Sequence, residues 1–239
     1  MHVLDNPVWH ALTGPQRALG RTTELAGRFD PDVAPFGALA SGSVTDSVWE
    51  DLAQLVGPKG TVSLTGDLPD LPPGWTVIAR FDGMQMVGDG ARRLGMDVGS
   101  SPPGSAESGL PVPVLLGSDD VSEMLALVEV TRPGPFERRT VEFGGYLGIR
   151  IDGQLVAMAG ERLRPPGYAE ISAVATDPNY QRRGLAGHLV LAVAEGILRR
   201  GDIPFLHAST TNMGAIRLYE SLGFTIRRPV VFLLLEAPG

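Results

Sequence analysis

The sequence has no cysteine, no long hydrophobic run and no excess of positive charge. Without cysteine, the chain cannot form disulfides, thiolate metal sites or a cysteine nucleophile. No stretch approaches the ~18 apolar residues that a membrane helix needs. Residues 1–14 lack the basic segment and apolar run of a signal peptide. We therefore expect a soluble, cytoplasmic protein without a membrane partner.

The charge balance argues against a nucleic-acid-binding protein. The formal net charge is −7, and a broad basic surface is therefore not expected. The four histidines are scattered, and the acidic residues show no ligand spacing. We expect no metal site, and a surface or capping role for the isolated His2 and His10. The hydrophobic content of 43% is typical of a chain that buries a sizeable core.

The chain is predicted to have two parts. Residues 88–111 are rich in Gly, Ser and Pro without an apolar period, which is typical of a linker or long loop. We therefore expect domains at 1–100 and 110–239. The first part combines strand-like segments at 33–39, 61–67 and 75–81 with a helix near 46–56, so a mixed α/β domain is expected there. It contains no recognisable catalytic constellation.

The second part is more regular and predicts a mixed-sheet α/β domain. Asp152–Gly153 between two apolar segments is a strong hairpin signal. Gly223 is placed as the stop of the last helix. Expected strands lie at 112–117, 145–151, 154–163, 168–176, 203–209 and 225–237. Expected helices lie at 119–131 (capped at Ser118 or Asp119), within 132–144, from about 184 to 200, and at 212–222.

The segment "QRRGLAG", residues 181–187, joins an expected strand to an expected helix. The first N–H groups of that helix are unpaired and lie at the positive end of its dipole. Gly184, Ala186 and Gly187 are small enough for an anion to approach the backbone, and Arg182 and Arg183 add positive charge. A phosphate or pyrophosphate site is one interpretation, and a tight turn with a surface arginine pair is the other. The spacing fits neither a Walker A loop nor the dinucleotide-binding G-x-G-x-x-G.

This segment resembles the Q/R-x-x-G-x-G/A signature of the GNAT superfamily of N-acetyltransferases. The resemblance spans about 112–235 and includes "GIRIDGQLVAMAGE", "AVATDPNY" and "TTNMGAIRLYESLGF". The sequence is also similar to an FR47-like group with an extra N-terminal half. In that case residues 1–100 would be a degenerate copy of a GNAT half.

The resemblance implies acetyl-CoA as cosubstrate. The backbone of strand residues Val174, Ala175 and Thr176 would pair with its pantetheine arm, next to a bulge at 172–174. Asn212 would contact the same ligand, or cap the last helix, or do both. The full set of implied contacts is Val174, Ala175, Thr176, Gln181, Arg182, Arg183, Gly184, Leu185, Ala186, Gly187, Asn212, Ala215 and Tyr219.

Acetyl transfer to an amine needs a base for the amine and an acid for the leaving thiolate. The resemblance implies that Tyr219 is the acid, although a packed aromatic is the alternative. It implies Glu170 as the base, with Glu161 as the competitor. His207 is either a proton relay through water or a buried structural residue, and His188 is expected at the surface. Strand alternation would place Glu170, Ser172, Val174 and Thr176 on one face.

The function expected from these features is transfer of acetyl to a primary amine of a small molecule or peptide. A protein lysine or N-terminal acetyltransferase and a non-catalytic acyl-CoA-binding module are the alternatives. The acceptor would bind near 131–145 and 164–168. The apolar segment 230–237 leaves open whether the chain forms a homodimer.

Overall fold

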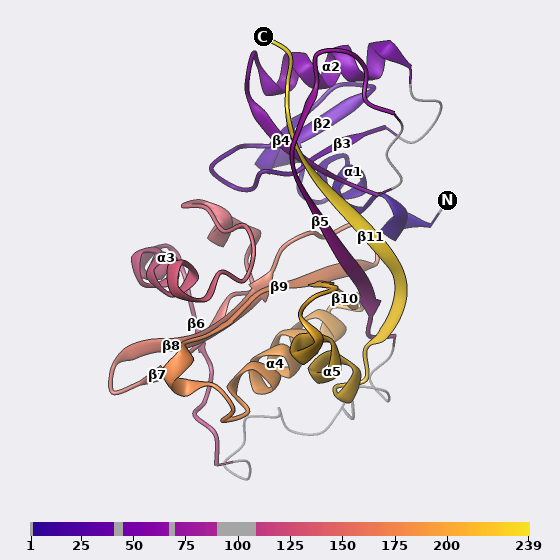
Figure 1. The fold of residues 1–239 in the computed structure, drawn as a ribbon. Helices are drawn as coiled ribbons and strands as arrows, with labels where there is room; N and C mark the ends of the chain where they lie inside the picture. The colour runs from indigo at the N-terminus through magenta and orange to yellow at the C-terminus, as the bar shows by residue number, and fades with distance from the viewer. Residues whose placement is uncertain (1, 41–44, 67–69, 90–108) are drawn as a thin grey trace.

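A computed structural model of the chain describes residues 2–40, 45–66, 70–89 and 109–239. Its main feature is an eight-stranded mixed sheet, in which only β9 and β10 run parallel (Figure 1). The strand order is β4 (Thr61–Thr65), β11 (Thr225–Glu236), β5 (Thr76–Val87), β10 (Ile203–Ser209), β9 (Tyr168–Thr176), β8 (Gln154–Glu161), β7 (Leu147–Ile151) and β6 (Val114–Leu115). The predicted mixed-sheet α/β class is confirmed.

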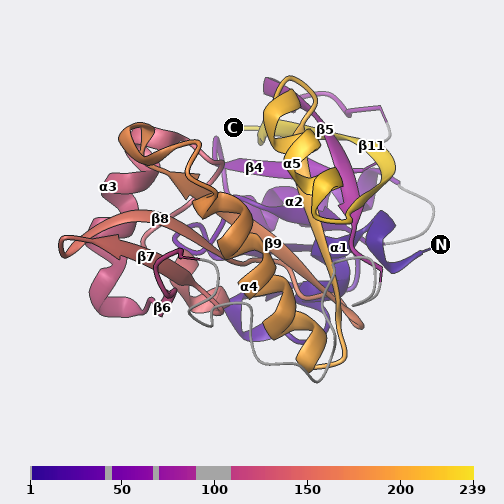
Figure 2. The ribbon, with the colours of Figure 1, turned by 90° about the horizontal axis from the view of Figure 1, so that it is seen from below.

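Helices cover both faces of this sheet. On one face, α4 (Leu185–Arg199) lies across β8 and β9, and α5 (Met213–Ser221) lies beside it (Figure 2). The opposite face is covered by α3 (Val121–Thr131) and by the N-terminal part of the chain. That part holds α1 (Pro7–Leu12), α2 (Asp46–Val56) and a small antiparallel sheet of β1 (Gly20–Thr22), β2 (Ala26–Phe29) and β3 (Gly37–Leu39). Short 3₁₀ helices are η1 (Val3–Asp5), η2 (Arg17–Leu19), η3 (Ser118–Asp120), η4 (Thr140–Phe143) and η5 (Pro178–Tyr180).

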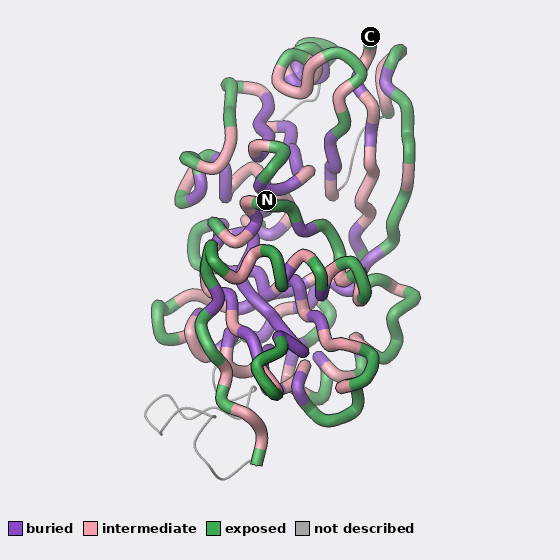
Figure 3. The backbone as a smooth tube through the Cα atoms, turned by 90° about the vertical axis from the view of Figure 1, so that its left-hand side faces the viewer, coloured by how far each residue is buried: buried purple, intermediate pink, exposed green. Residues whose placement is uncertain are grey.

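Two apolar layers cover the two sides of the sheet, and a third buried cluster joins α2 to β4 and the end of β11. One layer joins α4 and α5 to the strands and includes Leu189, Val193 and Ile216. The other joins α3 and the N-terminal part to the opposite face and includes Met158 and Phe205. Strands β8, β9 and β10 are mostly buried, whereas β5 is exposed or half-buried over most of its length, and Figure 3 shows exposed loops at the surface. The site described below therefore lies within a sheet that is packed from both sides.

Strand β5 lies between β10 and β11, although it precedes them by more than a hundred residues. It pairs with β11 from Thr76 to Val87 and with β10 from Gly83 to Val87. The sheet is therefore continuous across the two predicted domains. Most of the expected linker at 88–111 lies outside the described residues, and the division at 1–100 and 110–239 stays a prediction. The degenerate GNAT half likewise stays a prediction.

Local sequence signals agree well with the structure. Strands β9 and β10 have the predicted bounds, and α2, α3, α4 and α5 lie where helices were expected. Asp152 and Gly153 have φ values of 51° and 81°, as a two-residue hairpin of the primed type requires. The expected strand at 112–117 shortens to two residues, and the strand at 75–81 extends to Val87. Helix α1 and strands β1 and β2 were not predicted.

We predict that Gly160→Ala destabilises the fold. A Cβ at Gly160 would lie 2.3 Å from the ring of Tyr146, whose side chain is buried. Overpacking of this kind costs about 1–3 kcal/mol, and the measurement is denaturant unfolding. Gly117→Ala is the control, because no atom lies within 4 Å of its Cβ position. Equal unfolding free energies for both variants would contradict the prediction.

Candidate functional site

The site begins where β9 and β10 separate. Their pairing covers Tyr168–Ile171 against Ile203–Leu206 and then stops, although β9 continues to Thr176 and β10 to Ser209. Beyond Leu206, β10 pairs only with β5 on its other side. The facing edges of β9 and β10 thus form a fork. Backbone groups along such edges need partners, so the fork suits an extended ligand.

A β-bulge lies in β9 at the start of the fork. Met158 and Gly160 of β8 pair with Ala175 and Ser172, so β9 carries one extra residue between them. Ala173 has a φ of +52° at this point. The bulge expected at 172–174 is confirmed.

The bulge changes the face of the sheet on which the later side chains of β9 lie, so the predicted alternation along β9 is not observed. Glu170 points to the α3 side of the sheet, where it contacts His207. After the extra residue, Ala173 and Ala175 belong to the apolar layer on that side, while Val174 packs against the layer of α4. The prediction that Val174 and Thr176 share a face with Glu170 is therefore wrong, because one inserted residue reverses the alternation.

The turn 181–187 joins the open end of the fork to α4. Gly184 is the N-cap with φ +81° and provides no side-chain cap, and the first helical bond runs from His188 N to Gly184 O. Among the described residues, a Cβ at Gly184 would meet Leu110 alone, at 3.8 Å. The Gln181 amide donates to Thr176 O (3.3 Å), which ties the turn to the end of β9. The predicted strand and turn residues are thus brought together.

The two arginines of the turn are exposed on its outer side. Arg182 has a φ of +62°. Arg183 donates to Asn179 O (3.0 Å) and lies over the ring of Tyr180. His188, expected at the surface, is only 8% exposed, and its Nε2 has no hydrogen-bond partner in the part of the chain that the structure describes. That expectation is wrong, because His188 lies on the inner side of the first turn of α4.

Helix α5 packs against the same end of α4. Its N-cap is Asn212, whose side chain accepts from Ala215 N (3.1 Å), so the capping interpretation is confirmed. A Cβ at Gly187 in α4 would touch Leu218 of α5 at 3.5 Å. Contacts of Asn212, Ala215 and Tyr219 with a ligand stay predictions.

Tyr219 presents a phenol next to this helix contact. Its side chain is largely buried and packs edge-on to Phe224. Within the described residues its hydroxyl makes no hydrogen bond. Burial raises the pKa of Tyr219 to about 12. The phenol therefore keeps its proton at neutral pH, as a general acid must.

Glu170 is fully buried in an ion pair at the start of the fork. Arg162 donates to both carboxylate oxygens, from Nε at 2.9 Å and from Nη2 at 2.6 Å. His207 Nδ1 lies 2.6 Å from Oε1. Burial by itself raises the pKa of Glu170, but Arg162 and His207 together lower it to about 2. A carboxylate with both oxygens occupied and so low a pKa is a poor proton acceptor, so the geometry does not favour Glu170 as base.

Glu161 lies on the other face of the sheet. Arg164 Nε (2.9 Å) and Arg200 Nη2 (2.7 Å) both donate to its Oε2. Arg200 is the C-cap of α4, whereas the fork opens at its N-terminal end. A helix rises 1.5 Å per residue, so Glu161 contacts the end of α4 roughly 20 Å from the turn. This arrangement likewise does not favour Glu161 as base.

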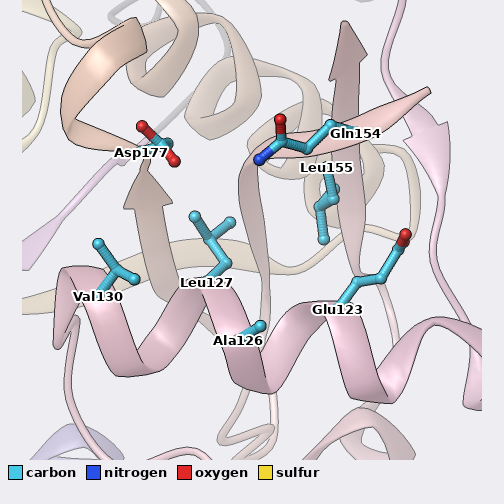
Figure 4. Close-up of a pocket in the computed structure, with 7 residues that line it drawn as sticks. All are labelled: Glu123, Ala126, Leu127, Val130, Gln154, Leu155 and Asp177. Carbon is cyan, nitrogen blue, oxygen red and sulfur yellow. The ribbon is translucent and has the colours of Figure 1, made fainter. Parts of the chain in front are cut away.

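A shallow pocket lies beside the fork, between α3 and the β7–β8 hairpin (Figure 4). Leu127 and Val130 of α3 line it, together with Leu155 and with Asp177, which follows β9. Its charged lining residues, Glu123 and Asp177, are both acidic. The pocket is therefore poorly suited to the phosphates of a nucleotide cosubstrate.

The described part of the chain offers neither a metal site nor a membrane span. No group of three or more His, Asp or Glu residues there could hold a metal ion. Among the described helices, none is both long enough and apolar enough to cross a membrane.

The comparisons with known proteins agree with this geometry. Residues 146–233 match the model of the FR47-like protein family. A crystal structure of a GNAT-family protein from Novosphingobium aromaticivorans DSM 12444 is 41% identical, covers 100% of both chains and superimposes with a TM-score of 0.84. On this full-length likeness, the chain belongs to the GNAT family.

Two curated relatives are similar over shorter segments. The N-alpha-acetyltransferase RimI of Mycobacterium tuberculosis is 35% identical over 96 residues, which are 38% of this chain and 60% of the relative. A mycothiol acetyltransferase of Acidimicrobium ferrooxidans is 34% identical over 101 residues, which are 40% of this chain and 32% of the relative. The matched segments thus span less than two thirds of either relative.

We predict that Glu170→Gln destabilises the protein by about 3–5 kcal/mol, because it leaves the Arg162 charge buried without its partner. The folded-state pKa of about 2 lies below the ordinary 4.5. The ion pair therefore contributes fully above about pH 4.5, and its contribution is lost as the pH falls toward 2. Denaturant unfolding at pH 7 and at low pH measures both effects.

Glu142→Gln is the matched control. Glu142 also accepts two bonds from one arginine, Arg139, but that pair is exposed. Its loss should cost no more than about 1 kcal/mol. A Glu170 variant as stable as the Glu142 variant would overturn the role of burial.

Proposed function

We propose that the protein is an acetyl-CoA-dependent N-acetyltransferase that acts on a primary amine of a small molecule or peptide. The observation that carries this proposal is the fork between β9 and β10, with an uncapped helix N-terminus at its open end. An extended ligand arm would lie in the fork, and an anionic head group joined to that arm would lie at the helix N-terminus.

The residues present are compatible with acetyl-CoA. The edge of β9 at 174–176 would pair with the pantetheine arm, and the buried Thr176 hydroxyl has no hydrogen-bond partner among the described residues. The N–H groups of Leu185, Ala186 and Gly187 would bind the pyrophosphate. Bound there, the cosubstrate supplies an acetyl group activated as a thioester.

The acceptor would approach from the face opposite α4, where α3, segment 131–145 and the N-terminal part border the fork. The relatives' names concern an N-alpha-acetyltransferase and a mycothiol acetyltransferase. These names support an amine acceptor. They are compatible with an amine of a peptide and with an amine of a small molecule. An N-terminal or lysine amine of a protein is the narrower alternative.

In the proposed step the amine nitrogen attacks the acetyl carbonyl, and the bond from carbon to sulfur breaks. Tyr219 donates its phenolic proton to the departing sulfur and is reprotonated from solvent. The amine loses its surplus proton to water at the start of the fork, because Glu170 and Glu161 are both held by arginines. Glu170 then acts by holding Arg162 and His207.

Acetyl-CoA binding is tested by calorimetric titration of the full chain. We expect one site per chain, and about tenfold weaker binding for Gly184→Ala, because the added methyl would project into the space in front of the helix N-terminus. Gly201→Ala is the matched control: Gly201 also has a positive φ (+84°) and follows the other end of α4. If wild type binds no acyl-CoA, the proposed activity is excluded.

For the acid, we expect Tyr219→Phe to lower kcat by about 10²–10⁴-fold while acetyl-CoA binding is unchanged. The matched control is Tyr168→Phe, because the Tyr168 hydroxyl contacts His2 at an exposed position. Release of free coenzyme A reports the rate without interference from protein thiols, since the chain has no cysteine. A Tyr219 variant as fast as wild type would leave the phenol a packing role only, and binding without any turnover would favour an acyl-CoA-binding module.

A further inference from the structure

His207 lies where the fork begins. It is the first residue of β10 beyond Leu206, the last residue that pairs with β9. Its side chain is 6% exposed and packs between the rings of Phe205 and Phe232. Both ring nitrogens have partners: Nδ1 contacts Glu170, and Nε2 lies 3.1 Å from Nε2 of Gln85. Gln85 belongs to β5, and therefore to the N-terminal part of the chain.

The orientation of the Gln85 amide is fixed by two other contacts. Its Nε2 donates to the backbone oxygen of Leu4 at 3.0 Å, and a carbonyl oxygen can only accept. Its Oε1 accepts from Nη1 of Arg227 at 2.6 Å, and a guanidinium can only donate. A flipped amide would oppose both partners. Gln85 therefore presents an N–H to His207.

This orientation determines the proton arrangement on His207. Because Gln85 donates, Nε2 of His207 must accept and carry no hydrogen. A neutral ring then has its hydrogen on Nδ1, where it donates to the Glu170 carboxylate at 2.6 Å. A charged imidazolium would place an Nε2–H against the Gln85 N–H.

The charged groups around His207 are held in ion pairs. Glu170 is paired with Arg162, and Asp5 with both Arg227 and Arg228. Tyr146 lies near the first pair as a neutral phenol, since burial raises its pKa far above neutral pH. The group in direct contact with Nε2, the Gln85 amide, decides which form of the ring fits.

We propose that Gln85 is a positioning residue that holds His207 neutral, as the Nδ1–H tautomer, at the start of the fork. Its effect on catalysis rests on the proposed function. The attacking amine becomes positively charged as it bonds to the carbonyl carbon, and a cation a few ångströms away would oppose that charge. A neutral His207 avoids this repulsion.

The tautomer is measured directly by long-range ¹⁵N–¹H NMR of the histidine rings in the full chain, with the His207 signals assigned by their loss in His207→Gln. We expect wild type at pH 7 to show a protonated Nδ1 and an unprotonated Nε2. An Nε2–H tautomer, or a charged ring at pH 7, would overturn the proposal without any variant.

Gln85→Glu tests the cause. A carboxylate at this position accepts from Nε2–H, so we expect the unprotonated Nε2 signal to be lost at pH 7. The matched control is Gln54→Glu, the same charge change at an exposed position of α2, which should leave the His207 signals unchanged. Unchanged signals in a folded Gln85→Glu variant would contradict the assignment.

Kinetics of the same variants separate this proposal from the proposed function. We expect Gln85→Glu to lower kcat by at least about tenfold with acetyl-CoA affinity unchanged. A charged ring with normal kcat would overturn the catalytic effect and leave the tautomer assignment standing. If wild type binds no acetyl-CoA, the proposed function fails, and the NMR result still decides the state of His207.

Discussion

Strand β10 can part from β9 because β5 continues to hold it along its opposite edge. A strand that parts from its neighbour exposes a row of N–H and C=O groups, and each of these needs a partner. On one edge of β10 the pairing with β9 ends at Leu206, and on the other edge the pairing with β5 runs from Phe205 to Ser209. The unpaired backbone is thereby limited to the facing edges of the fork. The proposed ligand site thus depends on a strand from the N-terminal part of the chain.

The same part of the chain also holds the proposed acceptor side. Backbone oxygens of Asp32 and Val33 accept from Arg139 N (2.8 Å) and from the Thr140 hydroxyl (2.6 Å), which anchors segment 131–145. The Gln16 side chain donates to the backbone oxygen of Arg162 (2.6 Å). These contacts are buried or half-buried, so they keep the acceptor side and the fork in a fixed relation. A mixed α/β domain without catalytic residues, as the sequence suggests, still determines the shape of the site.

The features that could be predicted from the sequence are local ones. The hairpin at Asp152–Gly153, the cap at Asn212 and the turn at Gly184 each follow from the conformations that a few adjacent residues allow. The position of β5 could not be read in this way, because strand pairing across more than a hundred residues leaves no periodic signal. A bulge in β9 could be placed from the family resemblance, but strand alternation alone does not include the reversal of faces that one extra residue causes.

The role of Glu170 shows the same limit for chemistry. Its residue type and strand position suggest a base, but its partners decide its behaviour. Arg162 follows β8 and His207 belongs to β10, so one carboxylate on β9 connects three neighbouring strands where main-chain pairing ends.

Charge-assisted bonds of this kind are about twice as strong as neutral ones. They oppose further separation of β9 from β10, which would otherwise proceed residue by residue along the ladder. The fork can then stay open toward α4 while its closed end remains fixed. Accepting a proton at this position would weaken those bonds, so the geometry favours a clamp over a base for this carboxylate, and a catalytic role of Glu170 stays a prediction.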